Sequence, residues 1–555
     1  MSNLVSFILN TLQGPVNDPE NTTLWLPKLL YTLKNDDGHK VLPVTAEKEN
    51  LGAIENSNGI FLSEQIANTW IIYLQTHDPG ITSSAAIPDP SNPYPSLSLT
   101  NMNIDGLQNV YALVGAATAH SDGYKVTVPL NFNHYGKTVG GVPMTPLRLV
   151  SGYSFTASVC TTTDGKTCNG EISDTLTGEG SLTAEIADAQ LQAELLVTVN
   201  GTGTGRTLGL ALDTLTLTGI DDKGPTFDIT EITITNFKYG SGFSSFIKQA
   251  MTSGQGQAAV FGSVNNALNT PDNIDAVSKA LLSRAGDILD RIFGPPPAGG
   301  LPSRDSGQEP SNPVDLLLFD RMRGALGTPA SNWYLPWQVA SLDDPVVDPY
   351  GKDKIEIGTK VFKGLTYKDI TLTDLVIAGT SNVEAPVDTV FLASPKITAT
   401  LDFGLLKAGG ERTVKRDGHD ARVPVPAAPP LSVTFGFAMT QEGISPVDIK
   451  GTVAVTVTGM TATLSITPSG DKASELVLDV GGFAVDLSAA TVTPTVTLDP
   501  PNPFLQGVVE QFFQSDTVKT DIADAITTQL TDQESEISKS VSASARAAIH
   551  AQLYS

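Results

Sequence analysis

Apolar and polar residues alternate with a period of two along most of the chain. Thr, Val and Ile dominate these runs, as expected on the pleated, half-buried surface of a β-sheet. Gly and Asp-Gly dipeptides separate one run from the next, which is typical of hairpin connections. We therefore expect antiparallel meanders. The clearest runs are Leu208-Leu210-Leu212, Phe227-Ile229, Val433-Phe435-Phe437, Val453-Val455-Val457 and Leu476-Leu478-Val480.

Helical periodicity is confined to a few segments. Ile66, Trp70 and Leu74 share one face of a helix that Ser63 is placed to cap. Another helix is expected from Asp272 to Ile292, because Gly294 and three prolines follow it. A short helix is also expected to begin near Val314.

A long helix is expected at the end of the chain, from about Ser515 to Leu553. Its apolar residues recur mostly every four positions, so the apolar stripe winds around the helix. Such a stripe suits a helix that lies along a curved sheet. The apolar positions are Val518, Ile522, Ile526, Leu530, Ile537, Val541, Ala545 and Ile549.

Two segments are dense in residues that break regular structure. Residues 294–313 read GPPPAGGLPSRDSGQEPSNP, which predicts a linker. Residues 408–430 carry Arg412, Lys415 and Arg416 and are interpreted as a long, solvated loop of the second half. The expected division is an N-terminal extension (1–60), a first module (61–294), a linker (295–313) and a second module (314–555).

The two halves repeat. The segment Leu97–Leu107 (LSLTNMNIDGL) matches Leu365–Leu375 (LTYKDITLTDL) in its apolar positions, at a shift of 268 residues. Each half then ends in a short aromatic segment, beginning at Phe243 or Phe504, followed by a long helix. The shared order of elements indicates a duplication.

The net charge of the chain limits the kinds of partner that it is expected to bind. The 555 residues include 34 basic and 59 acidic side chains, a net charge of -25. Nucleic-acid binding requires clustered Lys and Arg, so no nucleic acid is expected. No apolar run approaches the roughly 20 residues of a membrane span, so no transmembrane segment is expected. The N-terminus lacks a basic region before Leu4, which predicts no Sec signal peptide and a cytoplasmic or non-classically exported protein.

Little in the sequence indicates catalysis. The six histidines have no metal-ligand spacing, and no GxSxG motif occurs. The segment Asn101–Gly106 mimics the start of a calcium loop, but Ala112 stands where a bidentate Glu is required, so a strand is favoured. Cys160 and Cys168 flank the turn dipeptide Asp164-Gly165, which leaves a cross-strand disulfide and two reduced thiols both open. We expect no enzyme activity, metal or cofactor.

This order of elements resembles the tubular lipid-binding superfamily, over residues 60–294 and 310–555. That family includes bactericidal/permeability-increasing protein, plasma lipid-transfer proteins, insect takeout proteins and bacterial relatives in neurotoxin gene clusters. The missing leader favours the bacterial relatives. The resemblance implies an α+β, mainly antiparallel fold, with two tandem, highly curved sheets, each wrapped around a long C-terminal helix. It also implies apolar tubes that often hold lipid.

The expected function is therefore non-enzymatic binding of a lipid or other hydrophobic ligand in elongated apolar tubes. Polar substitution of Phe246 or Phe512 is expected to reduce ligand uptake and leave the fold intact. One alternative is an interaction component of a multiprotein, toxin-associated complex, with tubes filled by their own side chains. Another is a carbohydrate-active protein, which the 4 Trp and 12 Tyr disfavour. The expected ligand-binding residues are Phe243, Phe246, Ile247, Ile288, Leu289, Phe504, Val508, Phe512, Ile522 and Ile526.

Overall fold

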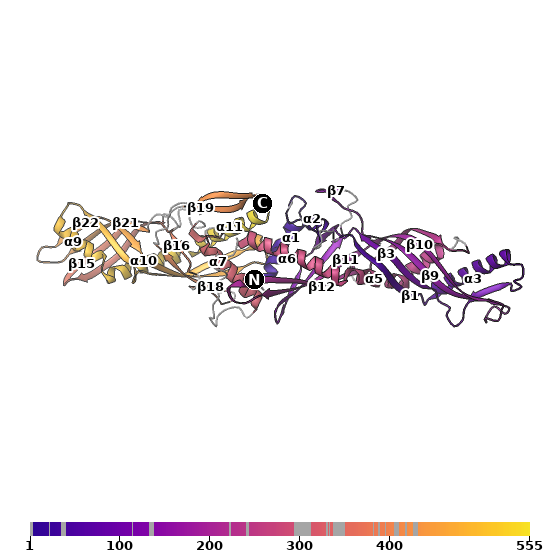
Figure 1. Ribbon diagram of the computed structural model, residues 1–555. Helices are drawn as coiled ribbons and strands as arrows, with labels where there is room; N and C mark the ends of the chain where they lie inside the picture. Colours follow the sequence, from indigo (N-terminus) through magenta and orange to yellow (C-terminus); the bar gives the residue numbers. More distant parts are fainter. Residues whose placement is uncertain are drawn as a thin grey trace.

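The protein is elongated in the computed structural model (Figure 1). The first half of the chain forms one end, the second half forms the other, and both termini lie near the middle. The structure describes residues 4–21, 23–34, 40, 42–113, 115–132, 138–220, 224–239, 244–293, 312–328, 331, 333–336, 350–380, 382–386, 389–393, 396–403, 410–416, 419–425 and 431–554.

The first half contains two antiparallel sheets. The first sheet has the order β1-β3-β9-β10-β13, with β2 paired to β9. Its strands are β1 (Val44–Ala53), β2 (Ala85–Pro88), β3 (Ser96–Asp105), β9 (Arg148–Thr162), β10 (Ser173–Ala187) and β13 (Thr226–Asn236). The second has the order β12-β11-β6-β4, with β5 paired to β6. Its strands are β4 (Val110–Ala112), β5 (Ala116–His120), β6 (Gly123–Phe132), β11 (Ala189–Asn200) and β12 (Thr207–Gly219). A short pair, β7 (Thr138–Val139) and β8 (Val142–Pro143), lies apart.

The second half repeats this plan. One sheet has the order β14-β15-β21-β22-β25, and the other has the order β16-β18-β23-β24, with β17 paired to β18. The strands of the first are β14 (Tyr350–Phe362), β15 (Leu365–Ala378), β21 (Ser432–Gln441), β22 (Val447–Thr458) and β25 (Thr491–Leu498). Those of the second are β16 (Val383–Glu384), β17 (Val390–Ala393), β18 (Lys396–Phe403), β23 (Met460–Ser469) and β24 (Val477–Asp486). The fold is thus α+β and mainly antiparallel, as expected.

The repeat extends to an irregularity in the backbone. The pairing of β3 with β9 shifts between Thr100 and Asn103, and that of β15 with β21 shifts between Lys368 and Thr371. Inside each shift one residue has a positive φ, 47° at Asn101 and 51° at Asp369. Asn and Asp tolerate this conformation better than other residues with a side chain. The two register shifts are 268 residues apart, and so are the two residues with a positive φ. The predicted repeat is therefore confirmed at single-residue register.

The helices differ from the sequence-based expectation in three respects. The helix expected to be capped by Ser63 begins at Ser57, and Asn56 caps it by accepting from Gly59 N at 2.9 Å. Helices α1 and α2, within the expected N-terminal extension, and helix α5 were not expected. The long C-terminal helix is broken at Gln533 into α10 and α11, both of which contact β24. The helices are α1 (Leu4–Asn17), α2 (Leu26–Tyr31), α3 (Ser57–His77), α4 (Ser244–Thr252), α5 (Gly254–Leu268), α6 (Pro271–Phe293), α7 (Pro313–Gly327), α9 (Pro503–Phe513), α10 (Asp516–Asp532) and α11 (Glu534–Leu553).

Helix side chains cover the outer edges of β12 and β24. Asn269, the C-cap residue of α5, accepts from Leu215 N and donates to Leu215 O, both at 2.8 Å. Ser542 on α11 accepts from Leu478 N at 2.8 Å. An uncovered edge strand is a template for pairing with another chain. Small polar residues within or at the end of these helices therefore satisfy backbone groups that a sheet edge leaves open.

Two segments lie differently from their sequence-based interpretation. Val44–Ala53, within the expected N-terminal extension, forms β1 and pairs with β3. The expected loop of residues 408–430 contains a hairpin of β19 (Gly410–Arg416) and β20 (His419–Val425). The strands read GERTVKR and HDARVPV, and the dipeptide Asp417-Gly418 that separates them in the sequence is typical of hairpin turns. Of the predicted linker, residues 295–311 lie outside the described residues.

The two cysteines form a disulfide, with an S–S distance of 2.00 Å. Of the two alternatives left open, the disulfide is the one that the structure shows, but it does not join two paired strands: Cys160 on β9 faces Ser173 of β10, while Cys168 lies in the connection between these strands. Asp164 accepts hydrogen bonds from the Thr167 hydroxyl and from two backbone amides in this connection. The bond from the Thr167 hydroxyl is the main reason that the pKa of Asp164 lies well below its usual value.

Each half has an apolar core of its own, and a third apolar cluster joins the two halves. Side chains of helices α1, α6, α7 and α11 meet there with those of strand β6. Helix α7 follows the predicted linker in sequence, yet it packs against β6, β11 and β12 of the first half. This junction cluster consists of Val5, Phe7, Leu24, Tyr124, Val126, Val197, Leu289, Ile292, Phe293, Val314, Leu318, Ala325, Leu476, Ala545, Ile549 and Leu553.

Candidate functional site

The second half has an apolar pocket between its first sheet and helices α9 and α10. Strands β21 and β22 form one wall, and α10 forms the opposite wall. Lys519 contributes the charged group of the lining. The lining residues are Val433, Phe435, Val455, Val457, Met460, Leu487, Val492, Phe513, Lys519, Ile522 and Ile526.

Local geometry explains why these side chains converge. Val433 and Phe435 are two residues apart on β21, so they face the same side of the sheet. Ile522 and Ile526 are four residues apart on α10, so they share one face of the helix. Phe513, at the end of α9, lies with its ring centroid 5.3 Å from that of Phe435. The pocket is the meeting point of one strand face, one helix face and one aromatic ring.

The pocket is small. Its volume is about 20 Å³, close to the space that one water molecule needs. Sites for drug-sized ligands usually enclose about 300–1,000 Å³. In this conformation the protein's own side chains therefore occupy most of the space between α10 and the sheet.

A larger groove lies elsewhere, between α11 and β24. It measures about 590 Å³ and is lined mainly by polar and charged residues. Ser538 and Ser542 in its wall hold the edge of β24, accepting from Val480 N at 2.9 Å and from Leu478 N at 2.8 Å. The composition of this groove does not suit a hydrophobic ligand, and part of its lining already has a structural role.

Lys519 is placed where an apolar side chain would be expected. It follows Val518 on the buried side of α10, and its side chain is half-buried. Its Nζ donates to the backbone carbonyl of Ala490 at 3.2 Å. In the described part of the chain, no carboxylate lies within ion-pair distance of this ammonium group.

The five residues of the second half that were expected to bind ligand fall into three groups by their position in the structure. Ile522 and Ile526 line the pocket. Phe512 is only 1% exposed and packs against Phe362 and Tyr367 rather than the pocket, so its polar substitution would damage the core. The expectation that the fold survives this change does not fit such burial. Val508 is half-buried, and Phe504 is 80% exposed and faces away from the core.

The expected residues of the first half do not form one site. Ile247 is fully buried in the core, and Phe246 packs edge-on against Phe61 at a centroid distance of 5.2 Å. Ile288 and Leu289 belong to the junction cluster, because α6 runs along β12 toward the middle of the molecule. Phe243 lies outside the described residues.

Sequence reasoning missed Phe513 and Lys519, although signals for both were present. Phe513 directly follows the expected Phe512, and one residue is enough to change the face that a helix presents. Lys519 precedes Ile522 by three positions, which places it on the same helix face. A single Lys within an otherwise apolar stripe was therefore the sequence signal for a charged group in the lining.

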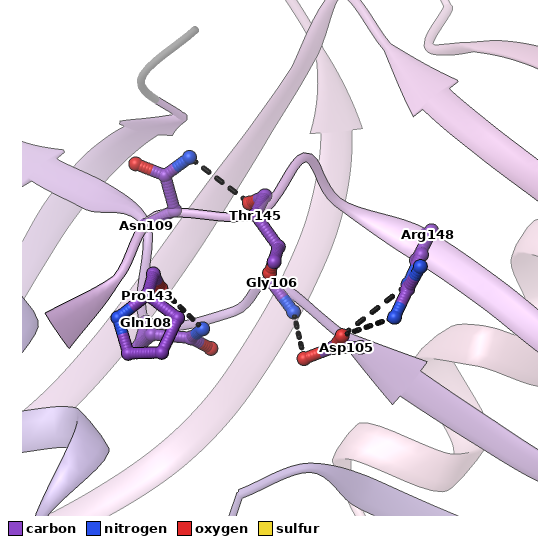
Figure 2. Close-up of polar contacts among 7 residues, drawn as sticks. All are labelled: Asp105, Gly106, Gln108, Asn109, Pro143, Thr145 and Arg148. Carbon is purple, nitrogen blue, oxygen red and sulfur yellow. Dashed lines mark hydrogen bonds and ion pairs between the residues drawn. The ribbon is translucent and has the colours of Figure 1, made fainter. Parts of the chain in front are cut away.

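The segment Asn101–Gly106, which mimics the start of a calcium loop, forms the end of strand β3 and the residue after it. The strand that the sequence favoured is therefore confirmed. Figure 2 shows Asp105 turned toward Arg148, whose Nη2 donates to Asp105 Oδ2 at 3.0 Å. Asp105 Oδ1 accepts from Gly106 N at 2.9 Å. Gly106 has a φ of 89°, and a Cβ there would lie 2.3 Å from Pro146 O. No group of three or more metal-ligating side chains occurs among the described residues.

Charged residues of α7 are buried at the junction with the first half. Asp320 is 0% exposed and forms ion pairs with Arg206 and with Arg323. Tyr124 Oη on β6 donates to Asp315 Oδ2 at 2.5 Å. Burial is the main cause that raises the pKa of Asp315, and the hydrogen bond from Tyr124 partly opposes it.

The Asp315→Asn variant is expected to gain stability relative to the wild type as the pH rises. Since its pKa is raised in the folded state, Asp315 favours folding below the ordinary Asp pKa of about 3.9, and this contribution is lost as the pH rises through the folded-state value. Asn keeps an acceptor for Tyr124 and carries no charge. Unfolding midpoints of both proteins between about pH 3 and pH 7 test this. A pH-independent difference would contradict it.

No helix in the described part of the chain has the length and apolar content needed to span a bilayer.

No protein-family model matches the sequence, and no curated protein matches it either. Several solved structures are similar in arrangement, among them the following two. Takeout 1 of Epiphyas postvittana is 16% identical, covering 38% of this chain and 86% of its own, with a TM-score of 0.24. Lipopolysaccharide-binding protein is 9% identical, covering 88% of this chain and 92% of its own, with a TM-score of 0.21. At these TM-scores neither similarity bears on what this chain binds.

Proposed function

We propose that this chain is a non-enzymatic protein of the tubular lipid-binding type, and that its second half binds a hydrophobic ligand between α10 and the sheet of β21 and β22. The supporting observation is the pocket lining, in which every residue other than Lys519 is apolar. Apolar burial supplies roughly 25 cal/mol per Å² toward binding, before the costs of ordering.

Binding requires the site to open. A pocket of about 20 Å³ does not admit an alkyl chain, so α10 or Phe513 must shift when the ligand enters. Helix α10 is a suitable moving element, because the residue Gln533 interrupts the helix and separates it from α11. Hydrophobic ligands would then be selected by the space that this movement creates.

Enlarging the pocket tests this proposal. Ile526→Ala removes lining atoms, and we expect it to bind a fluorescent fatty acid about tenfold more tightly than the wild type, because less reorganisation is needed. Leu530→Ala is the matched control, since Leu530 packs against the same core one turn later and does not line the pocket. Fluorescence titration of the full-length chain measures both. No detectable binding by the wild type and by Ile526→Ala would refute the proposal.

The second candidate function is an interaction component of a multiprotein, toxin-associated complex. The small pocket volume favours it, because a space filled by its own side chains carries no cargo. In that case the freshly purified protein would contain no solvent-extractable lipid and would co-purify with a protein partner. A stoichiometric hydrophobic molecule in the extract would instead favour ligand carriage.

A further inference from the structure

Lys519 is a positive group whose charge has no carboxylate counterpart among the described residues. An ammonium group has three donors, and the structure gives Lys519 one hydrogen bond, to Ala490 O at 3.2 Å. The chain has 59 acidic residues against 34 basic ones, so an acidic neighbour is the usual situation for a lysine here. Lys519 therefore retains capacity for an anionic partner.

The acidic residues near Lys519 on α10 do not form an ion pair with it. Asp521 pairs with Lys360 of β14, at 2.6 Å from Nζ to Oδ2. Asp516, one turn before Lys519, is exposed and begins the helix. The carbonyl of Ala490 that Lys519 contacts lies between β24 and β25, so the ammonium group sits at the boundary of the apolar lining.

We infer that the ligand of the second-half pocket is a single-chain amphiphile with an anionic head, a carboxylate or a phosphate monoester. The head would pair with Lys519, and the chain would enter between Ile522, Ile526 and Phe513. This inference rests on the proposed function and adds the chemistry of the head group to it. A lysine suits this role because it acts as a compact point charge that can follow a head group on its flexible stem.

Three probes with the same chain length separate the head group from the chain. They are dodecanoate, dodecyl phosphate and dodecan-1-ol, each titrated calorimetrically into the full-length chain. The variant Lys519→Met removes the charge and retains an unbranched apolar side chain. We expect it to weaken binding of the two anions about fivefold, the size of a partly exposed ion pair, with dodecan-1-ol unaffected.

The control is Lys248→Met in the first half. Lys248 also donates to a backbone carbonyl, that of Ile229, but Asp228 lies 3.5 Å from its Nζ. This variant is expected to bind all three probes as the wild type does. Circular dichroism and the thermal midpoint verify that both variants are folded.

The outcomes separate the two proposals. Selective loss of the anions in Lys519→Met supports the head-group inference. If the wild type binds the anions and dodecan-1-ol equally, and Lys519→Met binds them as the wild type does, the head-group inference is overturned. The proposed binding of a hydrophobic ligand would still stand. Absence of binding for all three probes overturns the proposed function and the inference together.

Discussion

Asp320→Ala is expected to destabilise the folded chain by about 3–5 kcal/mol, the usual cost of removing one partner from a buried ion pair. Asp320 is fully buried on α7 and pairs with Arg206 of the first half and with Arg323 of its own helix. Without this carboxylate, two guanidinium groups at the junction lose their shared counter-charge. Denaturant unfolding, followed by circular dichroism, measures the change.

Asp213→Ala is the matched control for this substitution. Asp213 is exposed and lies 3.7 Å from Lys125, so its loss is expected to change stability by at most about 0.5 kcal/mol. If Asp320→Ala behaves like this control, the buried cluster does not stabilise the contact between α7 and the first half.

Phe513→Ala is expected to lower stability by about 3–5 kcal/mol and to strengthen ligand binding at the same time. The stability loss follows from burial, because the ring is 1% exposed and packs against Phe435, Phe437 and Phe512 at centroid distances of 5.3 Å. The gain in binding follows from the vacated space, since an apolar cavity of roughly 150 Å³ can hold a benzene-sized molecule. Denaturant unfolding and titration with a fluorescent fatty acid give the two readouts.

Phe504→Ala on the same helix separates these effects from a general loss of aromatic content. Phe504 is 80% exposed, so its removal is expected to change neither stability nor binding beyond about 0.5 kcal/mol. A destabilised Phe513→Ala that binds no more of the probe would show that the space around this ring is not accessible to ligand.

The repeat was predictable because strand alternation reports which side of a sheet is buried. The match between Leu97–Leu107 and Leu365–Leu375 aligns the positions of Asn101 and Asp369, whose positive φ values coincide. The break at Gln533 was not predictable from the apolar stripe, because the stripe continues on both sides of it. Helix α5 was missed because its glycines and asparagines weaken the periodic signal.

The candidate site was partly predictable for a related reason. The periodicity of α10 identifies Ile522 and Ile526 as buried, but a period does not name the partner against which a face packs. Leu289 shows the consequence, because its helix face is buried in the junction cluster instead of the first core. Phe504 shows another limit, since an aromatic residue at the start of a helix can lie beyond the sheet that the helix covers.

Native mass spectrometry of the full-length chain with dodecanoate tests the central claim most directly. We expect one bound molecule per wild-type chain and none in Ile522→Trp, in which the larger side chain occupies the pocket. Ile72→Trp, at an exposed position in the first half, should bind like the wild type. Equal binding by Ile522→Trp, or no binding by the wild type, would contradict a ligand site between α10 and the sheet.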